Sequence, residues 1–148
     1  DMISPSTVLE ILDFTKEHYE SCDYALDIDG DIVDFIAEHV KRGCFTFSRG
    51  DNGRIRAVLF GWPVDMDVAV ESDGENDGLQ AVVSSECLYV NMLVVDPGIS
   101  KRQAVASILS LATRVQERWG CDITHVAYHR AKYGNRFKVS KFNAKELV

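Results

Sequence analysis

The sequence predicts an α/β fold in which a mixed, mostly antiparallel sheet is flanked by helices. Three observations support this class. Two helical patterns come before any strand pattern, an alternating hairpin follows them, and a strand, helix, strand series occupies residues 86–129. A series of that kind implies a right-handed crossover between two parallel strands. A chain of 148 residues can bury about two-thirds of its unfolded surface, so a single domain over residues 1–148 is expected.

The first two elements are predicted to be amphipathic helices. Apolar residues recur at helical spacing over residues 6–20, where Ser6 or Thr7 can serve as the N-cap. The same spacing returns over residues 32–42, and Gly43 suits a helix C-cap. The apolar positions are Val8, Ile11, Leu12, Thr15 and Tyr19 in the first helix, and Ile32, Val33, Ile36 and Val40 in the second.

A β-hairpin is predicted over residues 44–70. The segment CFTFSR alternates, DNG is a strong turn signal, and RIRAVLFGWPVDMDVAV is interpreted as the returning strand, with a bulge or bend at Pro63. The acidic segment ESDGENDG that follows is predicted to form an exposed turn.

The last elements are a strand at 86–95, a helix at 103–120, a strand at 121–129 and a final alternating strand, RFKVSKF. The helix places apolar residues on one face and ends at Gly120; these residues are Ala104, Ile108, Leu111, Ala112, Val115 and Trp119. The two parallel strands are expected to splay apart around residues 86–95 and 121–129. The binding cleft is predicted at that split.

Charge and composition limit the classes of partner. The net charge of -7 argues against general nucleic-acid binding, because a polyanion needs a basic surface. The basic segment near the C-terminus is interpreted as a solvated edge strand. No leader and no apolar run of the ~18 residues that a membrane span needs is found, so the expected location is cytoplasmic, and no membrane partner is expected.

The sequence predicts no metal site. The segment DIDGDIVDFIAE has acids at several positions of a calcium-binding loop, but Ile32 stands where that loop requires glycine. The four cysteines are widely spaced and suit buried, reduced thiols. His125 and His129 lie four apart on a strand, without a carboxylate beside them, and a single catalytic histidine stays open as an alternative, with His18 or His129 preferred.

The segment VDPGISKRQAVA follows a buried strand and opens a helix, a place where backbone amides can bind an anion. With the strand ending LVVDP before it, this segment and the order of elements resemble the GNAT acyltransferase superfamily. The resemblance implies that residues 93–95 pair with the pantetheine arm of acetyl-CoA or another acyl-CoA and that residues 101–106 wrap its pyrophosphate. The implied residues are Leu93, Val94, Val95, Lys101, Arg102, Gln103, Ala104, Val105 and Ala106.

The segment departs from the family pattern in its glycines. Ala104 and Ala106 occupy the two small positions of the family's Q/R-x-x-G-x-G/A loop. Alanine keeps the position small but gives up the backbone freedom of glycine at positive φ. The charges of Lys101 and Arg102 offset part of that loss.

Catalytic residues are implied less directly. Alternation places Tyr89, Asn91, Leu93 and Val95 on one face of the strand and Glu86 on the other, so Tyr89 or Asn91 would hold a water where family members use a glutamate base. The segment AKYGNRFKV resembles a shortened form of the family's closing motif. Tyr133 then stands in the place of the general acid.

The implied function is transfer of an acetyl or longer acyl group from acyl-CoA to an amine by direct attack, with a small-molecule or protein amine as acceptor. Two alternatives remain: an inactive GNAT-fold structural or interaction protein, for example of phage origin, and a lysine acyltransferase of the RTX-toxin-activating kind. The second is suggested by KVSKF and would use acyl carrier protein and His18, although Asn91 stands where an acid is needed. A homodimer also stays open.

Overall fold

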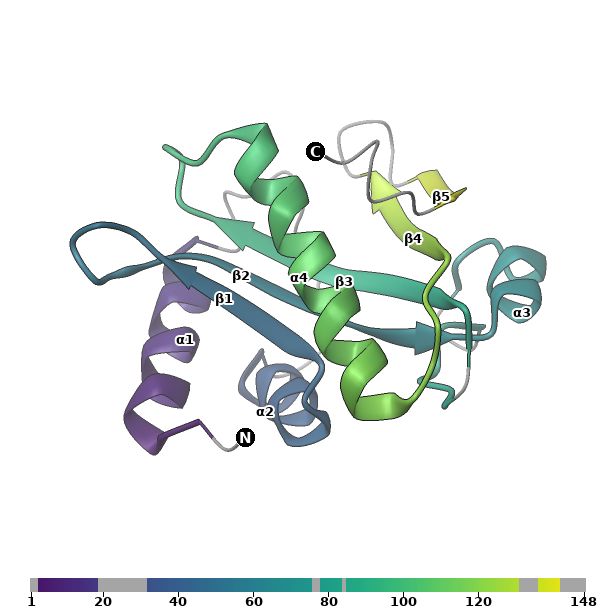
Figure 1. Ribbon diagram of the computed structural model, residues 1–148, viewed down its shortest axis with the longest axis horizontal. Coiled ribbons are helices and arrows are strands. Elements are labelled where there is room, and N and C mark those ends of the chain that lie inside the picture. Colours follow the sequence, from purple (N-terminus) through teal and green to yellow (C-terminus); the bar gives the residue numbers. More distant parts are fainter. Residues whose placement is uncertain (1–2, 19–31, 76–77, 84, 131–135, 142–148) are drawn as a thin grey trace.

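The computed structural model describes residues 3–18, 32–75, 78–83, 85–130 and 136–141. Figure 1 shows a central sheet with helices on both of its faces. The helices are α1 (Pro5–His18), α2 (Ile32–Arg42), α3 (Met66–Glu71) and α4 (Lys101–Trp119). The strands are β1 (Phe45–Arg49), β2 (Ile55–Val64), β3 (Cys87–Val95), β4 (His125–Arg130) and β5 (Arg136–Lys141).

The five strands lie in the sheet in the order in which they occur along the chain, β1-β2-β3-β4-β5. All neighbouring pairs are antiparallel except β3 and β4, which are parallel. The crossover between these two parallel strands contains α4. The predicted fold class, a mixed and mostly antiparallel sheet flanked by helices, is therefore confirmed.

Helix α4 covers one face of the sheet (Figure 1). Its apolar face is the one that the sequence predicts, and it packs on residues from β2, β3 and β4 in one buried cluster. Burial of this stripe stabilises the helix more than helix propensity does. The cluster contains Cys44, Leu59, Leu88, Val90, Leu93, Ala104, Leu111, Ala112, Val115, Ile123 and Val126.

The opposite face of the sheet carries two further clusters. Helices α1 and α2 bury Ile11, Phe14 and Ile36 against β1, β2 and the far half of β3. At the other end of the sheet, α3 buries Ala69 against Tyr89 and Ala127. The sheet is thus covered on both sides, which explains the nearly continuous apolar runs of β2 and β3.

The ends of α2 and α4 meet at one carbonyl group. The Arg42 carbonyl oxygen accepts hydrogen bonds from Arg118 Nε at 3.1 Å and Trp119 Nε1 at 3.2 Å. Arg114 Nε donates to the next carbonyl, that of Gly43. Arginines satisfy the otherwise unpaired carbonyls of a helix C-terminus and complement its dipole. These hydrogen bonds therefore join the last turns of α2 and α4.

The start of α4 is fixed by a reciprocal cap. The Ser100 hydroxyl accepts from the Gln103 amide, and the Gln103 side chain accepts from the Ser100 amide at 3.0 Å. At the other end Gly120 closes the helix in the left-handed conformation, as predicted. The sequence predicted the helix from residue 103, and the cap moves its start to Lys101.

We expect Ser100→Ala to lower the free energy of unfolding by about 1 kcal/mol, because the Gln103 amide loses its acceptor. Urea unfolding followed by circular dichroism measures this difference. Ser110→Ala is the control, because Ser110 is an exposed residue inside the same helix. Equal stability of the Ser100 variant and the wild type would contradict the assignment of the cap.

The predicted strand over residues 54–70 is wrong in its last third. Strand β2 ends at Val64, and Met66–Glu71 form α3 because the Asp65 side chain accepts from the Val68 amide and starts a helix. The irregularity expected at Pro63 lies instead in the β2–β3 pairing at Gly61. Strand β4 is also shorter than predicted and begins at His125.

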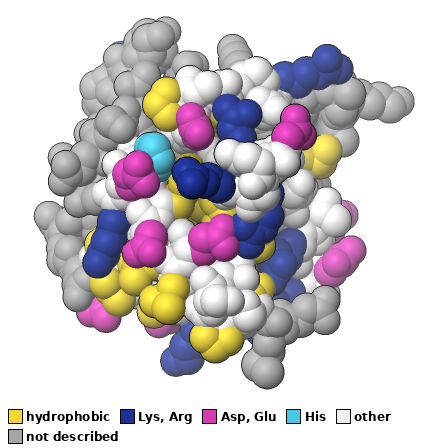
Figure 2. Space-filling model, turned by 90° about the vertical axis from the view of Figure 1, so that its left-hand side faces the viewer, with side chains coloured by type: hydrophobic (Ala, Val, Ile, Leu, Met, Phe, Trp, Pro, Cys, Tyr) yellow, Lys and Arg dark blue, Asp and Glu magenta, His cyan; other side chains and the backbone are white. Residues whose placement is uncertain are grey.

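In the described part of the chain, no helix has the length and apolar character that would be needed to cross a bilayer. Figure 2 shows the face over α1 and the β1–β2 turn, where acidic and basic side chains alternate among the residues that are coloured. The described surface on that side therefore presents no continuous basic area, in agreement with the net charge of -7.

Candidate functional site at the split between β3 and β4

The two parallel strands are paired over only three residue pairs: Cys87 with His125, Leu88 with Val126, and Tyr89 with Ala127. From Val90 onward, no residue of β3 is paired with a described residue of β4. The predicted splaying is therefore confirmed. The β3 segment from Tyr89 to Val95 spans roughly 20 Å at the usual rise of an extended strand, and it ends beside the start of α4.

Strand β3 contains a β-bulge at Asn91. Phe60 pairs with Met92 and the next residue, Gly61, pairs with Val90, so Asn91 is an extra residue in β3. The bulge reverses the alternation of side chains. Leu93 packs with α4, whereas Tyr89 and Asn91 point to the opposite face. The prediction that Tyr89, Asn91, Leu93 and Val95 share one face is wrong for this reason.

Gly61 is the residue that lets β2 approach the bulge. A Cβ atom at this position would lie 2.4 Å from the Tyr89 carbonyl oxygen and 3.2 Å from Leu111 of α4. Only a residue without a side chain allows this approach of two backbones under a helix.

Tyr89 forms a hydrogen bond with His129 across the two strands. The distance from Tyr89 Oη to His129 Nδ1 is 2.8 Å, and the rings meet edge to face. Tyr89 belongs to the last paired position of β3, and His129 lies two residues beyond the last paired position of β4. The pair therefore bridges the strands at the point where they part.

The tautomer of His129 follows from its second contact. The Gly74 backbone lies beside His129 Nε2 and raises the pKa of His129, so Nε2 is assigned as the nitrogen that carries the proton. Nδ1 then accepts, and the Tyr89 hydroxyl donates to it. Burial raises the pKa of Tyr89, so the phenol stays protonated, and burial lowers the pKa of His129 below 6.5, so the imidazole is neutral near pH 7.

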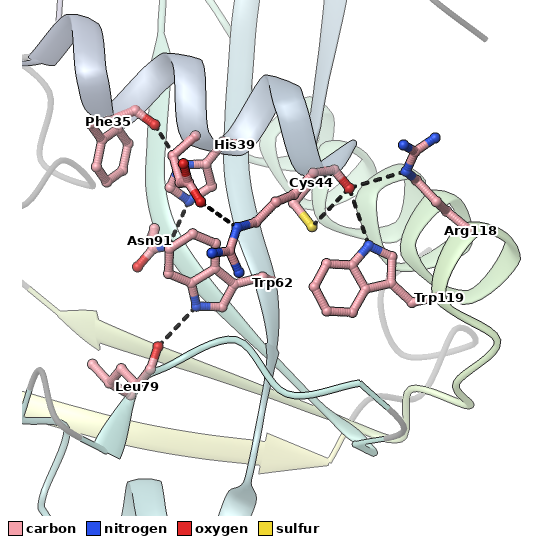
Figure 3. Close-up of polar contacts among 10 residues, drawn as sticks. Phe35, His39, Cys44, Trp62, Leu79, Asn91, Arg118 and Trp119 are labelled. Carbon is pink, nitrogen blue, oxygen red and sulfur yellow. Dashed lines mark hydrogen bonds and ion pairs between the residues drawn. The ribbon is translucent and has the colours of Figure 1, made fainter.

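Asn91 is held by a second histidine, His39 of α2 (Figure 3). The distance from Asn91 Nδ2 to His39 Nε2 is 2.7 Å, and His39 Nδ1 donates to the Phe35 carbonyl at 2.8 Å. His39 is 1% exposed, and its ring lies parallel to Trp62 with centroids 4.4 Å apart. Burial lowers the pKa of His39 to about 4.

This cluster extends to the surface through Trp62. The Trp62 indole donates to the Leu79 carbonyl at 2.9 Å, and the Arg42 guanidinium lies over the indole at 5.3 Å from its centroid. Glu38 pairs with Arg42 at 2.6 Å. Every polar group of the His39 and Trp62 rings is thus paired, which is typical of a buried structural network.

The segment predicted to bind pyrophosphate lies at the start of α4. Ser100 already satisfies the amide of Gln103, and its carbonyl accepts from the Ala104 amide. The first-turn amides of Lys101 and Arg102 are therefore the ones that an anion would meet. The Ala104 side chain is buried in the core, whereas those of Arg102 and Gln103 are exposed.

A polar hollow of about 330 Å³ lies on the other side of α4. It runs between β1 and α4, and its walls include Thr46, Ser48, Gln103, Ala106 and Ser107. Two predicted pyrophosphate residues, Gln103 and Ala106, therefore face β1 rather than the split. Because helical positions 103 and 106 differ by three, one face of the helix carries both.

Two other residues considered from the sequence are Tyr133 and His18. Tyr133 lies outside the described residues. His18 ends α1 and its ring contacts Phe14. Among the described residues, no group of His, Cys, Asp and Glu is arranged to hold a metal ion.

Sequence reasoning found Tyr89 and considered His129, but it missed the contact between them. His39 was considered only as one of four histidines that could be a base or a ligand, and Trp62 was given no role. Alternation along a strand shows which face a residue takes, but the partner across a parallel pair depends on the register, which is set by the crossover. The bulge at Asn91 left no mark in the sequence that a count of alternating residues could detect.

The comparisons with solved structures decide the fold. The structure of an agmatine N-acetyltransferase mutant in its apo form has 18% sequence identity with this chain. The match covers 85% of this chain and 72% of the acetyltransferase chain, with a TM-score of 0.54. The protein has the GNAT fold. A GNAT-like decarboxylase in complex with isobutyryl-CoA is 14% identical and covers 84% of this chain and 62% of its own, with a TM-score of 0.57.

A third structure of the same fold is the polyamine N-acetyltransferase of Drosophila melanogaster, an enzyme that forms N-acetylagmatine. It is 18% identical and covers 85% of this chain and 72% of its own, with a TM-score of 0.53. No family model and no curated protein matches the sequence. These three GNAT-fold structures therefore share the backbone arrangement with this chain and little of its sequence.

Proposed function

We propose that the protein is a single-domain, cytoplasmic acyltransferase that moves an acetyl or longer acyl group from acyl-CoA to an amine by direct attack. The observation that supports this most is the split between β3 and β4, which opens beside the first turn of a capped helix. Two solved GNAT-fold neighbours are named for acetylation of agmatine or polyamines, and a third is in complex with isobutyryl-CoA. A small-molecule amine is the acceptor that agrees with those names.

The proposed roles follow the geometry of the split. The β3 segment of Leu93, Val94 and Val95 would lie along the pantetheine arm. The amides and cations of Lys101 and Arg102 would bind the pyrophosphate. The other residues proposed for that segment are Gln103, Ala104, Val105 and Ala106, of which Gln103 and Ala106 face β1. The thioester would then reach the polar side chains at the inner end of the split, where Tyr89 lies, with Tyr133 as the proposed acid.

The observed hydrogen bond changes the proposal for Asn91. Its side-chain amide donates to His39, a residue that is 1% exposed. An amide held in this way fixes the bulge, and its remaining carbonyl oxygen can hold a water. We therefore retain Asn91 in the site and assign it chiefly to the shape of β3.

Calorimetric titration with acetyl-CoA tests the proposal. We expect saturable heat in the wild type and none in the double variant Lys101→Glu, Arg102→Glu, because the reversed charges repel the pyrophosphate. The matched control is Arg136→Glu, Lys138→Glu, which makes the same charge change on the exposed side of β5. Absence of heat in the wild type at high ligand concentration would favour an inactive GNAT-fold interaction protein.

The carrier-protein alternative makes a different prediction. It requires an acid on the central strand, and that place holds Asn91 paired to His39. Transfer from acyl carrier protein that disappears in His18→Ala would favour it over the acyl-CoA reaction.

A further inference from the structure

The pair formed by Tyr89 and His129 has a placement that a packing contact does not need. It lies at the inner end of the split, where β3 and β4 stop pairing, and it joins the two strands by a 2.8 Å hydrogen bond. The residues that contact it come from three places: Ala127 from β4, Phe137 from β5, and Gly74 from the turn after α3.

The two histidines on this face differ in access. His39 is buried, and both of its ring nitrogens have partners within the core. The side chain of His129 is partly exposed. Its buried nitrogen faces Tyr89, whereas the surrounding charges, Asp73 and Glu75, lie in the turn after α3. His129 therefore lies between the buried phenol of Tyr89 and an exposed acidic turn, whose two carboxylates would stabilise a proton added to the imidazole.

The turn after α3 packs against the His129 ring at Gly74. Gly74 has φ of +76°, and a Cβ atom there would come within 2.6 Å of His129 Nε2. The Gly74 amide donates to the Ala69 carbonyl at 3.0 Å, so the turn is anchored to α3. The short contact with the imidazole therefore depends on a residue without a side chain.

We propose that Tyr89 and His129 form the proton relay of acyl transfer: Tyr89, which is 2% exposed and lies at the inner end of the split, takes the proton that the amine releases there, and His129 stores it. This proposal rests on the proposed acyltransferase function. It makes His129 a positioning and proton-accepting residue that acts through Tyr89.

The proposed step transfers the acyl group from sulfur to nitrogen. The nitrogen of the uncharged amine attacks the thioester carbonyl carbon, the C–N bond forms, and the C–S bond breaks to release CoA as a thiolate. The nitrogen gives its proton to Tyr89 Oη while Tyr89 gives its own proton to His129 Nδ1. The imidazolium is stabilised by Gly74, Asp73 and Glu75. Tyr133, the acid of the proposed function, protonates the thiolate, while the imidazolium releases its proton to water and a proton from water restores Tyr133.

The burial of Tyr89 and His129 favours the protonation states that the relay requires. Burial keeps Tyr89 protonated by raising its pKa, so that it passes protons without ionising. Burial lowers the pKa of His129, whereas Gly74, Asp73 and Glu75 raise it, and the net direction is downward. The imidazole is therefore neutral and able to accept near pH 7.

The test compares three variants of the full chain in acetyl transfer from acetyl-CoA to agmatine and to spermidine. We expect His129→Gln and Tyr89→Phe each to lower kcat by about 100-fold, the lower end of the range for general acid–base catalysis. The double variant should be no worse than either single variant, because both remove one relay. His125→Gln is the control, since His125 lies on the same strand and bonds to the neighbouring Thr124.

The pH profile separates a relay from a packing role. In the wild type, kcat should fall as pH drops through the His129 pKa, which lies below 6.5, and this limb should be absent in His129→Gln. Calorimetry with acetyl-CoA shows whether each variant still folds and binds. Wild-type turnover that persists with an unchanged pH profile in His129→Gln would overturn the relay alone. Acetyl-CoA binding without turnover by the wild type would overturn the proposed transferase as well.

Discussion

The free energy of unfolding is expected to fall by roughly 3 kcal/mol between pH 6.5 and pH 4 through His39 alone. Burial lowers the pKa of this imidazole from 6.5 to about 4 in the folded protein. Below pH 6.5 the unfolded chain takes up a proton that the folded chain does not bind until the pH reaches about 4. At 1.36 kcal/mol per pH unit, this difference gives the stated loss.

Stability falls toward low pH because folding lowers the pKa of His39. A group whose pKa is lowered on folding contributes stability above its unfolded value, and that stability is lost as pH falls. Urea unfolding of the wild type and of His39→Gln at pH 7.5, 6, 5 and 4 measures the effect. The variant should have the flatter profile, because its side chain does not titrate.

His125→Gln serves as the control, because it removes a histidine of β4 that is only partly buried. Its profile should follow that of the wild type. If His39→Gln lost stability over this range as steeply as the wild type does, the imidazole would not be the group responsible. Asn91→Ala adds an independent check, since it leaves His39 Nε2 buried without a donor, a change that costs about 1–3 kcal/mol at any pH.

Gly61→Ala is expected to destabilise the protein by about 3 kcal/mol, the upper end of the usual range for overpacking. The added methyl group would lie 2.4 Å from the Tyr89 carbonyl oxygen, which belongs to the backbone of a central strand and cannot rotate away. Either β2 and β3 separate at the bulge or Leu111 moves, and both changes disturb the core under α4. Urea unfolding at neutral pH measures the loss.

Gly98→Ala is the matched control for that substitution. Its added methyl group would meet the guanidinium end of Arg56 at 2.8 Å, and a flexible side chain can move aside. The expected change is within about 0.5 kcal/mol, as for most surface substitutions. Equal stabilities of the Gly61 and Gly98 variants would show that the close approach of β2 and β3 does not depend on glycine.

Local patterns predicted α4 well because they act within a few residues. The apolar stripe from Ala104 to Trp119 and the αL cap at Gly120 could both be identified by spacing. The same method misassigned Met66–Glu71. Apolar and polar residues alternate there as in a strand, but the Asp65 side chain caps the Val68 amide, and a short helix results. One hydrogen bond outweighed the alternation.

The sequence by itself determined the order of the elements other than α3, the apolar face of α4, and the parallel crossover that opens the split beyond Tyr89 and Ala127. These features depend on spacing along the chain, because helices and strands bury side chains with fixed periods. The tertiary structure alone decided which residues meet at the split. Asn91 shifts the alternation of β3 by one residue, and this shift separates Tyr89 from Leu93 and directs its hydroxyl to His129, 40 residues away. A contact of that kind depends on the register between strands, and the packing of the whole sheet sets it.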